Sequence, residues 1–512
     1  MSDLSDGPDT VTAEVVRLHP DDNVAIAARR IGAGADIGSE RVFTLQPIPS
    51  GHKVATRPIA AGAPVLKYGQ VIGAAVGDIA AGAHVHTHNL AASDLRLAAQ
   101  PAPSLSGAVP PRTFQGFRRA NGKVGVRNYI GVLTSVNCSA TVARLLAERA
   151  VQAGLLADHP TIDGIVPIAH ASGCGMAGSG EGFELLRRTL WGTAGNPNFG
   201  AILLVGLGCE VLQVGSLARG SGLAGNPAFQ SYTIQDAGGT RRAVEQGLER
   251  LADLIPLAAA AKRTECPASE LVLGLQCGGS DAWSGITSNP ALGNAVDRLV
   301  ALGGTAILSE TPEIYGAEHL LFARARSPEV VTRLQARIDW WQAYAHRHGV
   351  ELDNNPSPGN KAGGLTTILE KSLGAVAKSG TAVLDDVVEY AEPVRGRGLV
   401  FMDSPGFDPC SATGQVASGA TMIAFTTGRG SAFGCKPSPS IKLSSNTDIY
   451  ERMSEDIDLD CGPVATGRAT IEEKGAEILD LMLRVASGQQ TASEALGYGG
   501  AEFVPWQLGA TL

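Results

Sequence analysis

The stretch Leu271-Val-Leu-Gly-Leu-Gln-Cys-Gly-Gly-Ser-Asp281 decides the fold class predicted for this chain. A short apolar run ends abruptly in polar groups, which is typical of a buried strand that delivers side chains to a site at its carboxyl end. Cys277, Ser280 and Asp281 offer a soft ligand, a hydrogen-bond donor and a charge, and the glycines let a ligand approach the backbone. For this stretch alone, a tight strand-to-helix turn around a buried thiol is the simpler interpretation.

The same pattern recurs along the chain, and this changes the interpretation. The apolar run that begins near residue 129 is followed by Cys138, and the run near 163 is followed by His170 and Cys174. The run near 201 is followed by Cys209-Glu210, and the run near 304 by Glu310. Helical patterns alternate with these runs, which favours a mostly parallel α/β sheet. Because parallel strands end at one edge of a sheet, we expect the four cysteines 138, 174, 209 and 277 to face a common metal-assisted or thiol-bearing active site.

Composition bounds the class of protein. A chain of 512 residues predicts two to four domains, and 64 glycines with 44% hydrophobic but only 5% aromatic residues indicate a glycine-rich α/β enzyme. The net charge of −9 and the absence of a basic run argue against a nucleic-acid partner. No apolar run reaches membrane length and the first residues lack a signal-peptide pattern, so we expect a cytoplasmic protein without membrane association. The eight dispersed cysteines favour buried thiols or metal ligands over disulfides.

Five segments are predicted from local patterns. Residues 1–12 form a disordered polar tail, and 13–95 form a small all-β domain of short strands punctuated by glycine. An Ala/Pro/Ser-rich linker covers 96–112. The α/β body divides into residues 113–395 and a C-terminal α/β domain, 396–512.

Three histidines close the β segment. On a strand, His84, His86 and His88 share one face, because side chains alternate with a period of two. Such a set can bind one metal ion or hold an anion, and a solvated polar edge explains it equally well.

Several cationic and amide groups suit an anionic ligand. Arg119 and Arg127 flank a hairpin predicted at Asn121-Gly122. The two arginines could bind a carboxylated ligand, and a surface hairpin with solvated charges explains them equally well. A Pro/Gly-rich loop with Asn355 and Lys361 precedes a helix predicted over 367–379, whose amino terminus suits an anion. Arg429 lies between two glycines after another predicted strand, and its guanidinium is suited to bidentate binding of a carboxylate.

The motifs together resemble the altronate/galactarate dehydratase family over nearly the whole chain. The matching pieces are Asp22-Asn-Val-Ala, Gly51-His52-Lys53, His84-x-His86-x-His88-Asn, Arg119-Ala-Asn-Gly-x-Val-Gly-Val-Arg-Asn128, Gly206-Leu-Gly-Cys-Glu210, Gln276-Cys-Gly-Gly-Ser-Asp281, Asn355-Pro-Ser-Pro-Gly-Asn-Lys361 and Thr426-Thr-Gly-Arg-Gly430. The resemblance implies a small N-terminal SAF (β-clip) domain before a large α/β body. The runs Tyr315-Gly-Ala-Glu-His-Leu-Leu and Phe503-Val-Pro-Trp-Gln-Leu-Gly are more similar to the altronate branch than to the galactarate branch.

The resemblance implies a hydro-lyase that converts a sugar acid, a small-molecule substrate, into a 2-keto-3-deoxy acid. The proton alpha to a carboxylate is weakly acidic, so a divalent metal must stabilise the enediolate while an acid helps the C3 hydroxyl to leave. The family is associated with Fe2+, and Mn2+ or an iron–sulfur cluster on the strand-end cysteines are the alternatives.

With the N-terminal domain folded over the body, each group of residues receives an expected role. The expected metal ligands are His86, His88, Cys209 and Glu210, with Cys138, Cys174 and Cys277 as alternative thiols. The expected catalytic residues are His52, His170 and Lys361. The expected substrate-binding residues are Arg119, Arg127, Asn128, Ser280, Asp281, Asn355 and Arg429.

Three other functions stay open at this point. The first is dehydration of galactarate or another aldarate or aldonate. The second is a lyase that expels a different C3 group such as sulfite, because the enediolate chemistry is shared. The third is a non-catalytic sugar-acid binding protein, against which the reactive strand ends argue. A homodimer is the default assembly.

Overall fold

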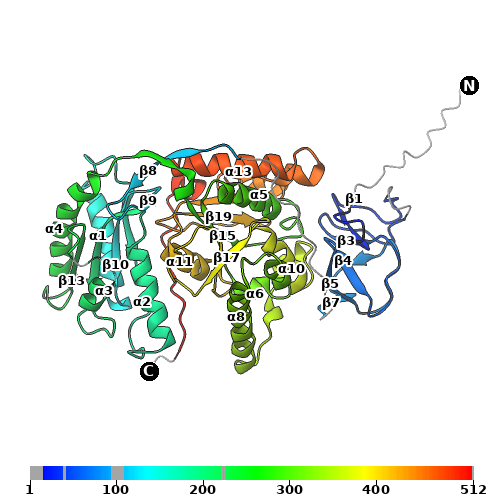
Figure 1. The fold of residues 1–512 in the computed structure, drawn as a ribbon, viewed down its shortest axis with the longest axis horizontal. Coiled ribbons are helices and arrows are strands. Elements are labelled where there is room, and N and C mark those ends of the chain that lie inside the picture. Colours follow the sequence, from blue (N-terminus) through cyan, green and yellow to red (C-terminus); the bar gives the residue numbers. More distant parts are fainter. Residues whose placement is uncertain (1–14, 38–41, 94–108, 221–222, 224, 510–512) are drawn as a thin grey trace, which may run out of the picture.

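The computed structural model describes residues 15–37, 42–93, 109–220, 223 and 225–509. They form three domains, with the third domain placed between the N-terminal domain and the second domain (Figure 1). The predicted tail at 1–12 and most of the predicted linker at 96–112 lie outside the described residues.

The N-terminal domain consists of short antiparallel strands, as expected. One sheet has the order β1-β2-β3-β6 and the other β4-β5-β7. Their bounds are β1 Val15–Val16, β2 Val24–Ala27, β3 Lys53–Ala55, β4 Pro64–Lys67, β5 Gln70–Ala75, β6 His84–Val85 and β7 Leu90–Ala91. The glycine-punctuated apolar runs of the sequence become these strands.

The second domain opens with the predicted hairpin and continues as a four-stranded parallel sheet, order β11-β10-β12-β13. The hairpin strands β8 (Thr113–Arg118) and β9 (Val124–Gly125) form a small sheet with β14 (Thr264–Pro267). The parallel strands are β10 Tyr129–Thr134, β11 Gly164–Ile168, β12 Phe199–Gly206 and β13 Phe229–Thr233.

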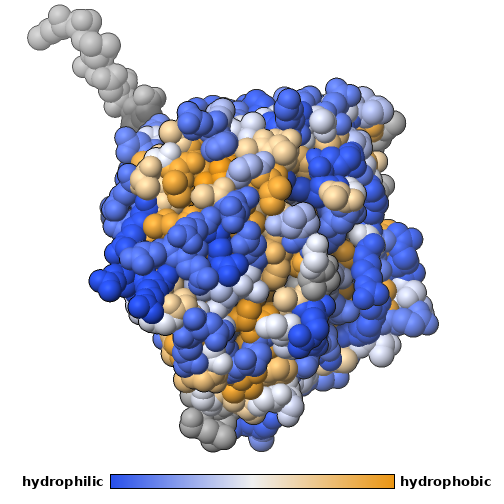
Figure 2. Space-filling view, turned by 90° about the vertical axis from the view of Figure 1, so that its left-hand side faces the viewer, coloured by the Kyte–Doolittle hydropathy of each residue, from blue (hydrophilic) through white to orange (hydrophobic). Residues whose placement is uncertain are grey.

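Helices cover both faces of this sheet. α1 (Ala140–Gln152) and α4 (Thr240–Ala259) pack on one face, and α2 (Glu181–Ala194) and α3 (Val214–Gly220) pack on the other. The outer face of the domain shows apolar groups interspersed with polar ones (Figure 2). No helix among the described residues is long and apolar enough to cross a membrane.

The third domain is built on a seven-stranded parallel sheet, order β17-β18-β16-β15-β19-β20-β21. Its strands are β15 Val272–Cys277, β16 Thr305–Leu308, β17 Leu384–Val388, β18 Gly398–Met402, β19 Met422–Thr427, β20 Ser440–Ser444 and β21 Leu459–Asp460. The stretch Leu271–Asp281 therefore contains the central strand, β15, of this sheet.

The helices of the third domain cover both faces of the sheet. The bounds are α5 Ser288–Ala301, α6 Thr311–Ile314, α7 Glu318–Phe322, α8 Pro328–Arg347, α9 Pro358–Ala362, α10 Ile368–Ala377, α11 Asp408–Ser418, α12 Thr447–Arg452, α13 Ile471–Ala486 and α14 Ala492–Ala495. α5 and α13 pack on one face and α11 on the other.

Two features of this arrangement correct the sequence predictions. The seven-stranded sheet runs across residue 395, so the body divides between β13 and β15 and not at 395/396. Cys277 ends a strand of the third-domain sheet, whereas Cys138, Cys174 and Cys209 follow strands of the second-domain sheet. The four cysteines therefore do not share one edge, because an apolar run identifies a strand but not the sheet that the strand joins.

Candidate active site

A cavity of about 600 Å³ opens at the carboxyl ends of the central strands of the third domain. This is where open α/β sheets bind their ligands. The segments that line it follow β15, β16 and β18, and further residues come from the loop before α9 and from α10. The polar lining residues include Cys277, Ser280, Glu313, Asn355, Ser357, Asn360, Lys371 and Asp408.

A cluster of opposite charges forms one wall. Potential ligand atoms of Cys277, Glu310 and Glu313 lie within 4.8 Å of one another, the only such set of three among the described residues. Lys378 Nζ donates to Cys277 Sγ at 2.9 Å and lies 3.8 Å from Glu310 Oε2. Lys371 pairs with the Glu313 carboxylate. Two ammonium groups therefore stand among two carboxyl groups and a thiol.

Burial and these neighbours set the protonation states. Burial raises the pKa of Glu310 well above its usual value, and Glu313 adds to the rise. Burial alone would raise the pKa of Glu313 as well, but Lys371 and Lys378 outweigh it and lower that pKa. Burial raises the pKa of Cys277 to about 11. Burial thus favours the protonated forms of Glu310 and Cys277, whereas the two lysines favour the ionised form of Glu313.

Glu310 has an unusual backbone conformation, and Asp408 has an unusual pKa. Glu310 has a left-handed backbone, φ 72°, which is a strained conformation for a residue with a side chain, and such strain clusters at functional sites. Neither of its carboxylate oxygens has a hydrogen-bond partner among the described residues. Burial, with help from Glu313, raises the pKa of Asp408 to about 7. A carboxyl group with a pKa near 7 is suited to acid–base catalysis.

Ser280 lines the cavity in the loop after β15, and Asp281 follows it. The buried Asp281 carboxylate accepts hydrogen bonds from Ser284, Ser445 and Asn446, so it fixes the loop after β15. Arg429 approaches this loop, where its backbone N–H donates to Gly279 O at 2.9 Å and its side chain is exposed. Ser280 and Asn355 line the cavity as expected, whereas the oxygens of Asp281 are used within the fold.

The N-terminal domain reaches the cavity wall through its histidines. His52 Nδ1 lies 2.9 Å from His84 Nε2, and the ring centroids of His84 and His88 are 5.6 Å apart. His86 Nε2 lies 3.0 Å from Lys361 O and His52 Nε2 3.4 Å from Ala362 O. These carbonyls belong to α9, whose Asn360 donates from Nδ2 to Ser280 O at 2.7 Å. One short helix therefore connects the histidine cluster to the cavity.

A buried ion cluster docks the two domains. Lys53 Nζ donates to Glu370 Oε2 at 2.9 Å and Lys67 Nζ to Glu370 Oε1 at 2.8 Å, and all three side chains are at most 1% exposed. This cluster was not predicted from the sequence. The signal that could have found it is a lysine inside each of two buried strands, Lys53-Val-Ala and Pro-Val-Leu-Lys67, because buried charges are almost always paired.

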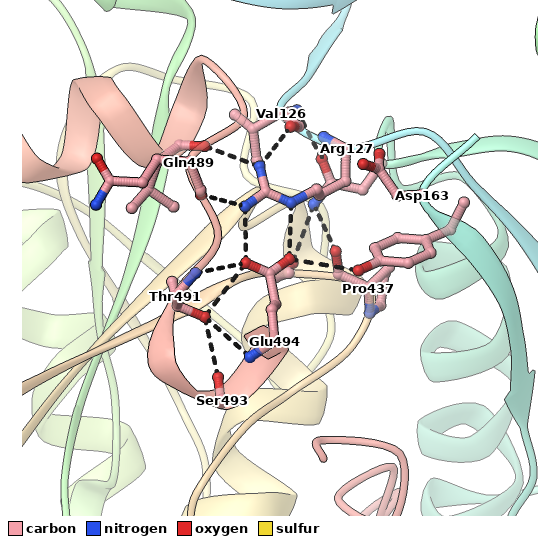
Figure 3. A network of polar contacts seen from close by, with 12 residues as sticks. Val126, Arg127, Asp163, Pro437, Gln489, Thr491, Ser493 and Glu494 are labelled. Atoms are coloured by element: carbon pink, nitrogen blue, oxygen red, sulfur yellow. Dashed lines mark hydrogen bonds and ion pairs between the residues drawn. The ribbon is translucent and has the colours of Figure 1, made fainter. Parts of the chain in front are cut away.

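Arg127 has a structural role, which corrects the expectation that it holds a substrate. Its guanidinium makes two hydrogen bonds of 2.7 Å to Glu494 of α14 and donates its other N–H groups to the carbonyls of Val126, Val485 and Gln489 (Figure 3). All five N–H donors are thus engaged. This pair ties the second domain to the third.

Arg119 and Asn128 are engaged in the same way. Arg119 donates to Pro197 O, Arg127 O and Asn128 Oδ1, and Asn128 Nδ2 donates to Thr161 O and Ala258 O. The predicted hairpin is present, but its polar groups hold the second domain together. Neither residue lines the cavity.

The expected metal set is divided between two distant domains. His86 and His88 lie in the N-terminal domain, whereas Cys209 and Glu210 follow β12 in the second domain, on the far side of the third domain (Figure 1). Glu210 is already held by Ser135 Oγ and Gly208 N, both at 2.6 Å. One chain therefore does not assemble this set.

The three expected catalytic residues do not line the cavity either. His170 is buried in the second domain, where it contacts Ser172 Oγ and Thr134 O, and burial lowers its pKa to about 4. His52 and Lys361 lie at the domain interface, behind the cavity wall. Glu313, Lys371 and Asp408 line the cavity and Lys378 belongs to its charged wall, and none of the four was singled out from the sequence. Lys371 and Lys378 are seven residues apart in the segment predicted as a helix, and this spacing places both on one face.

Comparisons with known proteins agree with this architecture. Residues 13–93 match the altronate/galactarate dehydratase SAF domain, 116–259 the D-galactarate dehydratase/altronate hydrolase second domain, and 268–511 the D-galactarate/altronate dehydratase C-terminal domain. The last two ranges divide the body where the sheets do.

Curated relatives match over most of the chain. An altronate dehydratase from Escherichia coli is 36% identical over 98% of this chain and 100% of its own length. A galactarate dehydratase (L-threo-forming) from the same organism is 37% identical over 96% of each chain. The beta subunit of a (2R)-sulfolactate sulfo-lyase from Chromohalobacter salexigens is 35% identical over 78% of this chain and 98% of its own length. On this evidence, the chain belongs to the altronate/galactarate dehydratase family.

Proposed function

We propose that this chain is a hydro-lyase that dehydrates a sugar acid, altronate foremost, to a 2-keto-3-deoxy acid in the third-domain cavity. The observation that carries the proposal is the cluster of Glu310, Glu313 and Cys277 with two buried lysines at the carboxyl end of the central strands. The full-length similarity to altronate and galactarate dehydratases supports the reaction class.

The residues of the wall suit the charge changes of a dehydration. Removal of the C2 proton places negative charge on the substrate carboxylate, and the charged Lys371 ammonium lies where it stabilises that charge. Asp408, with a pKa of about 7, is the group suited to take or return a proton. Ser280 and Asn355 present hydrogen-bonding groups to the substrate hydroxyls.

The wall also fits a divalent metal ion, for which we propose Fe2+ with Mn2+ as the alternative. Cys277, Glu310 and Glu313 would hold it, and the Glu310 oxygens without hydrogen-bond partners are the observation that supports the fit. A mixed oxygen and sulfur donor set suits a borderline ion. Such an ion supplies Lewis-acid stabilisation of the substrate carboxylate. Because burial raises the pKa of Glu310 and of Cys277, binding of the ion would be coupled to the release of protons from these two groups.

A lyase that expels sulfite from C3 is the second candidate. The similarity to the sulfo-lyase beta subunit over 78% of this chain is the observation that favours it. Both reactions pass through a charge-stabilised enediolate and differ in the leaving group.

One substrate panel tests both functions. Purified full-length protein is loaded anaerobically with Fe2+ and assayed for 2-keto acid from altronate, galactarate, other aldonates and aldarates, and for sulfite from sulfolactate. We expect altronate to give the largest kcat/KM, and Glu313→Gln to lower it by about 10²- to 10³-fold. The matched control is Glu249→Gln, an exposed carboxylate on α4, which should retain full activity. Turnover by Glu313→Gln at the control rate would reject the proposed site.

A further inference from the structure

The second domain holds three thiols that the proposed dehydration does not use. Cys138, Cys174 and Cys209 are exposed, whereas the other five cysteines are buried. Each follows the carboxyl end of one of three neighbouring strands, β11, β10 and β12. The fold therefore brings three thiols to one edge of one parallel sheet, the edge at which such sheets bind ligands.

The edge also offers a polar neighbour to one of the thiols. Gln235 Nε2 donates to Cys209 Sγ at 3.5 Å. Three exposed thiols on neighbouring strand ends provide soft ligands for a borderline metal such as iron.

The loops that present the thiols have conformations that require glycine. Gly173, directly before Cys174, has φ 93°, and a Cβ there would lie 2.9 Å from Ser135 O. Gly208, directly before Cys209, has φ 126°, and a Cβ there would lie 2.4 Å from Gln235 Oε1. Any other residue at these two positions would have to shift the backbone that presents Cys174 and Cys209.

The spacing of the sulfurs distinguishes between a single ion and a cluster. One tetrahedral ion with metal–sulfur bonds of about 2.3 Å holds its ligand sulfurs about 4 Å apart. The Sγ atoms of Cys138, Cys174 and Cys209, all three described in the structure, do not all lie within 4.8 Å of one another. A cubane cluster fits wider spacing, because each cysteine ligates a different iron.

We propose that Cys138, Cys174 and Cys209 ligate an iron–sulfur cluster of the [4Fe–4S] type, whose fourth iron receives no thiolate from this domain. Glu210, the nearest carboxylate in sequence, is held by Ser135 and Gly208 and leaves that iron to an oxygen ligand from solvent or a small molecule. This site is separate from the Cys277 wall in the third domain and does not depend on the proposed function.

Anaerobic reconstitution of the full-length protein with iron and sulfide tests the proposal. We expect about four iron and four sulfide per wild-type chain, with a brown sulfur-to-iron charge-transfer absorption. Cys138→Ser, Cys174→Ser and Cys209→Ser should each lose most of the cluster, and the triple variant all of it. Cys435→Ala, which removes a buried thiol of the third domain, is the matched control and should load like the wild type.

Two results would overturn the proposal: iron uptake without acid-labile sulfide, or a triple variant that loads like the wild type. Circular dichroism of each variant tests whether it is folded. We expect all the variants to fold, because the three thiols are exposed and not part of a core. Cluster content is measured without substrate, so it is independent of turnover. Cys277→Ser should keep the full cluster while its dehydratase activity falls, which separates this site from the active site.

Discussion

Lys53 of the N-terminal domain and Glu370 of the third domain form a fully buried ion pair, with Lys53 Nζ 2.9 Å from Glu370 Oε2. Lys67 binds the other carboxylate oxygen, and Thr366 donates to Glu370 from its backbone N and its hydroxyl. One carboxylate therefore neutralises two ammonium groups at the interface. Glu370 therefore supplies the counter-charge for both lysines of the N-terminal domain.

We expect Glu370→Gln to undock the N-terminal domain. The substitution leaves two buried ammonium groups without a counter-charge, at a cost of about 3–5 kcal/mol. Hydrogen exchange should rise in residues 42–93 and in α9 while β10–β13 keep their protection. The exposed Lys123→Met is the control for a lost charge. Unchanged exchange at this interface in Glu370→Gln would contradict the docking role.

Acid should weaken the N-terminal domain and its interface. Burial, with neighbouring histidines, lowers the pKa of His52 and of His84 to about 4 from 6.5. Between pH 6.5 and pH 4 the unfolded chain binds protons that the folded chain does not, so stability is fully present above pH 6.5 and declines as the pH falls through this window. Thermal unfolding followed across this range should show the decline, and the double variant His52→Asn/His84→Asn should flatten it. An equal slope in the double variant would assign the acid sensitivity to other groups.

Arg127→Met should destabilise the protein without a specific effect on catalysis. It leaves Glu494 buried and unpaired between the second and third domains, at a cost of about 3–5 kcal/mol. Because Arg127 is remote from the cavity lining, the KM of folded enzyme should equal that of the wild type. Denaturant unfolding and steady-state kinetics below the unfolding transition measure the two effects. A raised KM with unchanged stability would restore the substrate-binding role expected from the sequence.

Lys378→Met should impair catalysis more than binding. The ammonium donates to Cys277 and lies 3.8 Å from Glu310 Oε2, so its loss removes positive charge from the wall that faces the developing enediolate. We expect kcat to fall by about 10²-fold or more with a smaller change in KM. Lys378→Arg, which keeps the charge, should recover part of the loss. A normal kcat in Lys378→Met would place the chemistry elsewhere.

Local patterns predicted the elements better than their assembly. The apolar runs before Cys138, Cys174, Cys209 and Cys277 are all parallel strands, and the β-rich N-terminal domain and the hairpin are present. The common edge for all four cysteines was wrong, because strands of both sheets look alike in sequence. Close packing between domains is equally hidden in sequence: α2 lies against α11 so closely that a Cβ on Gly192 would be 2.2 Å from Ala417 O.

The site shows the same division. Ser280 and Asn355 were predicted from their motifs, and both line the cavity. Arg127 was expected to bind a carboxylate because arginine often does so. Its five N–H donors are instead bound to Glu494 and to three backbone carbonyls. The residue type defines which partners a side chain can bind, but only the fold shows which partner it does bind.

The sequence by itself determined the α/β class, the strand ends that carry reactive groups and the family, because periodicity and motif spacing are local properties of the chain. Only the tertiary structure decided that Cys138, Cys174 and Cys209 follow strands of one sheet and Cys277 a strand of another, and that Glu310, Glu313, Lys371 and Lys378 form the charged wall. Those groupings depend on contacts between residues far apart in the chain. Burial in such contacts, and not residue type, sets which carboxyl group is ionised and which keeps its proton.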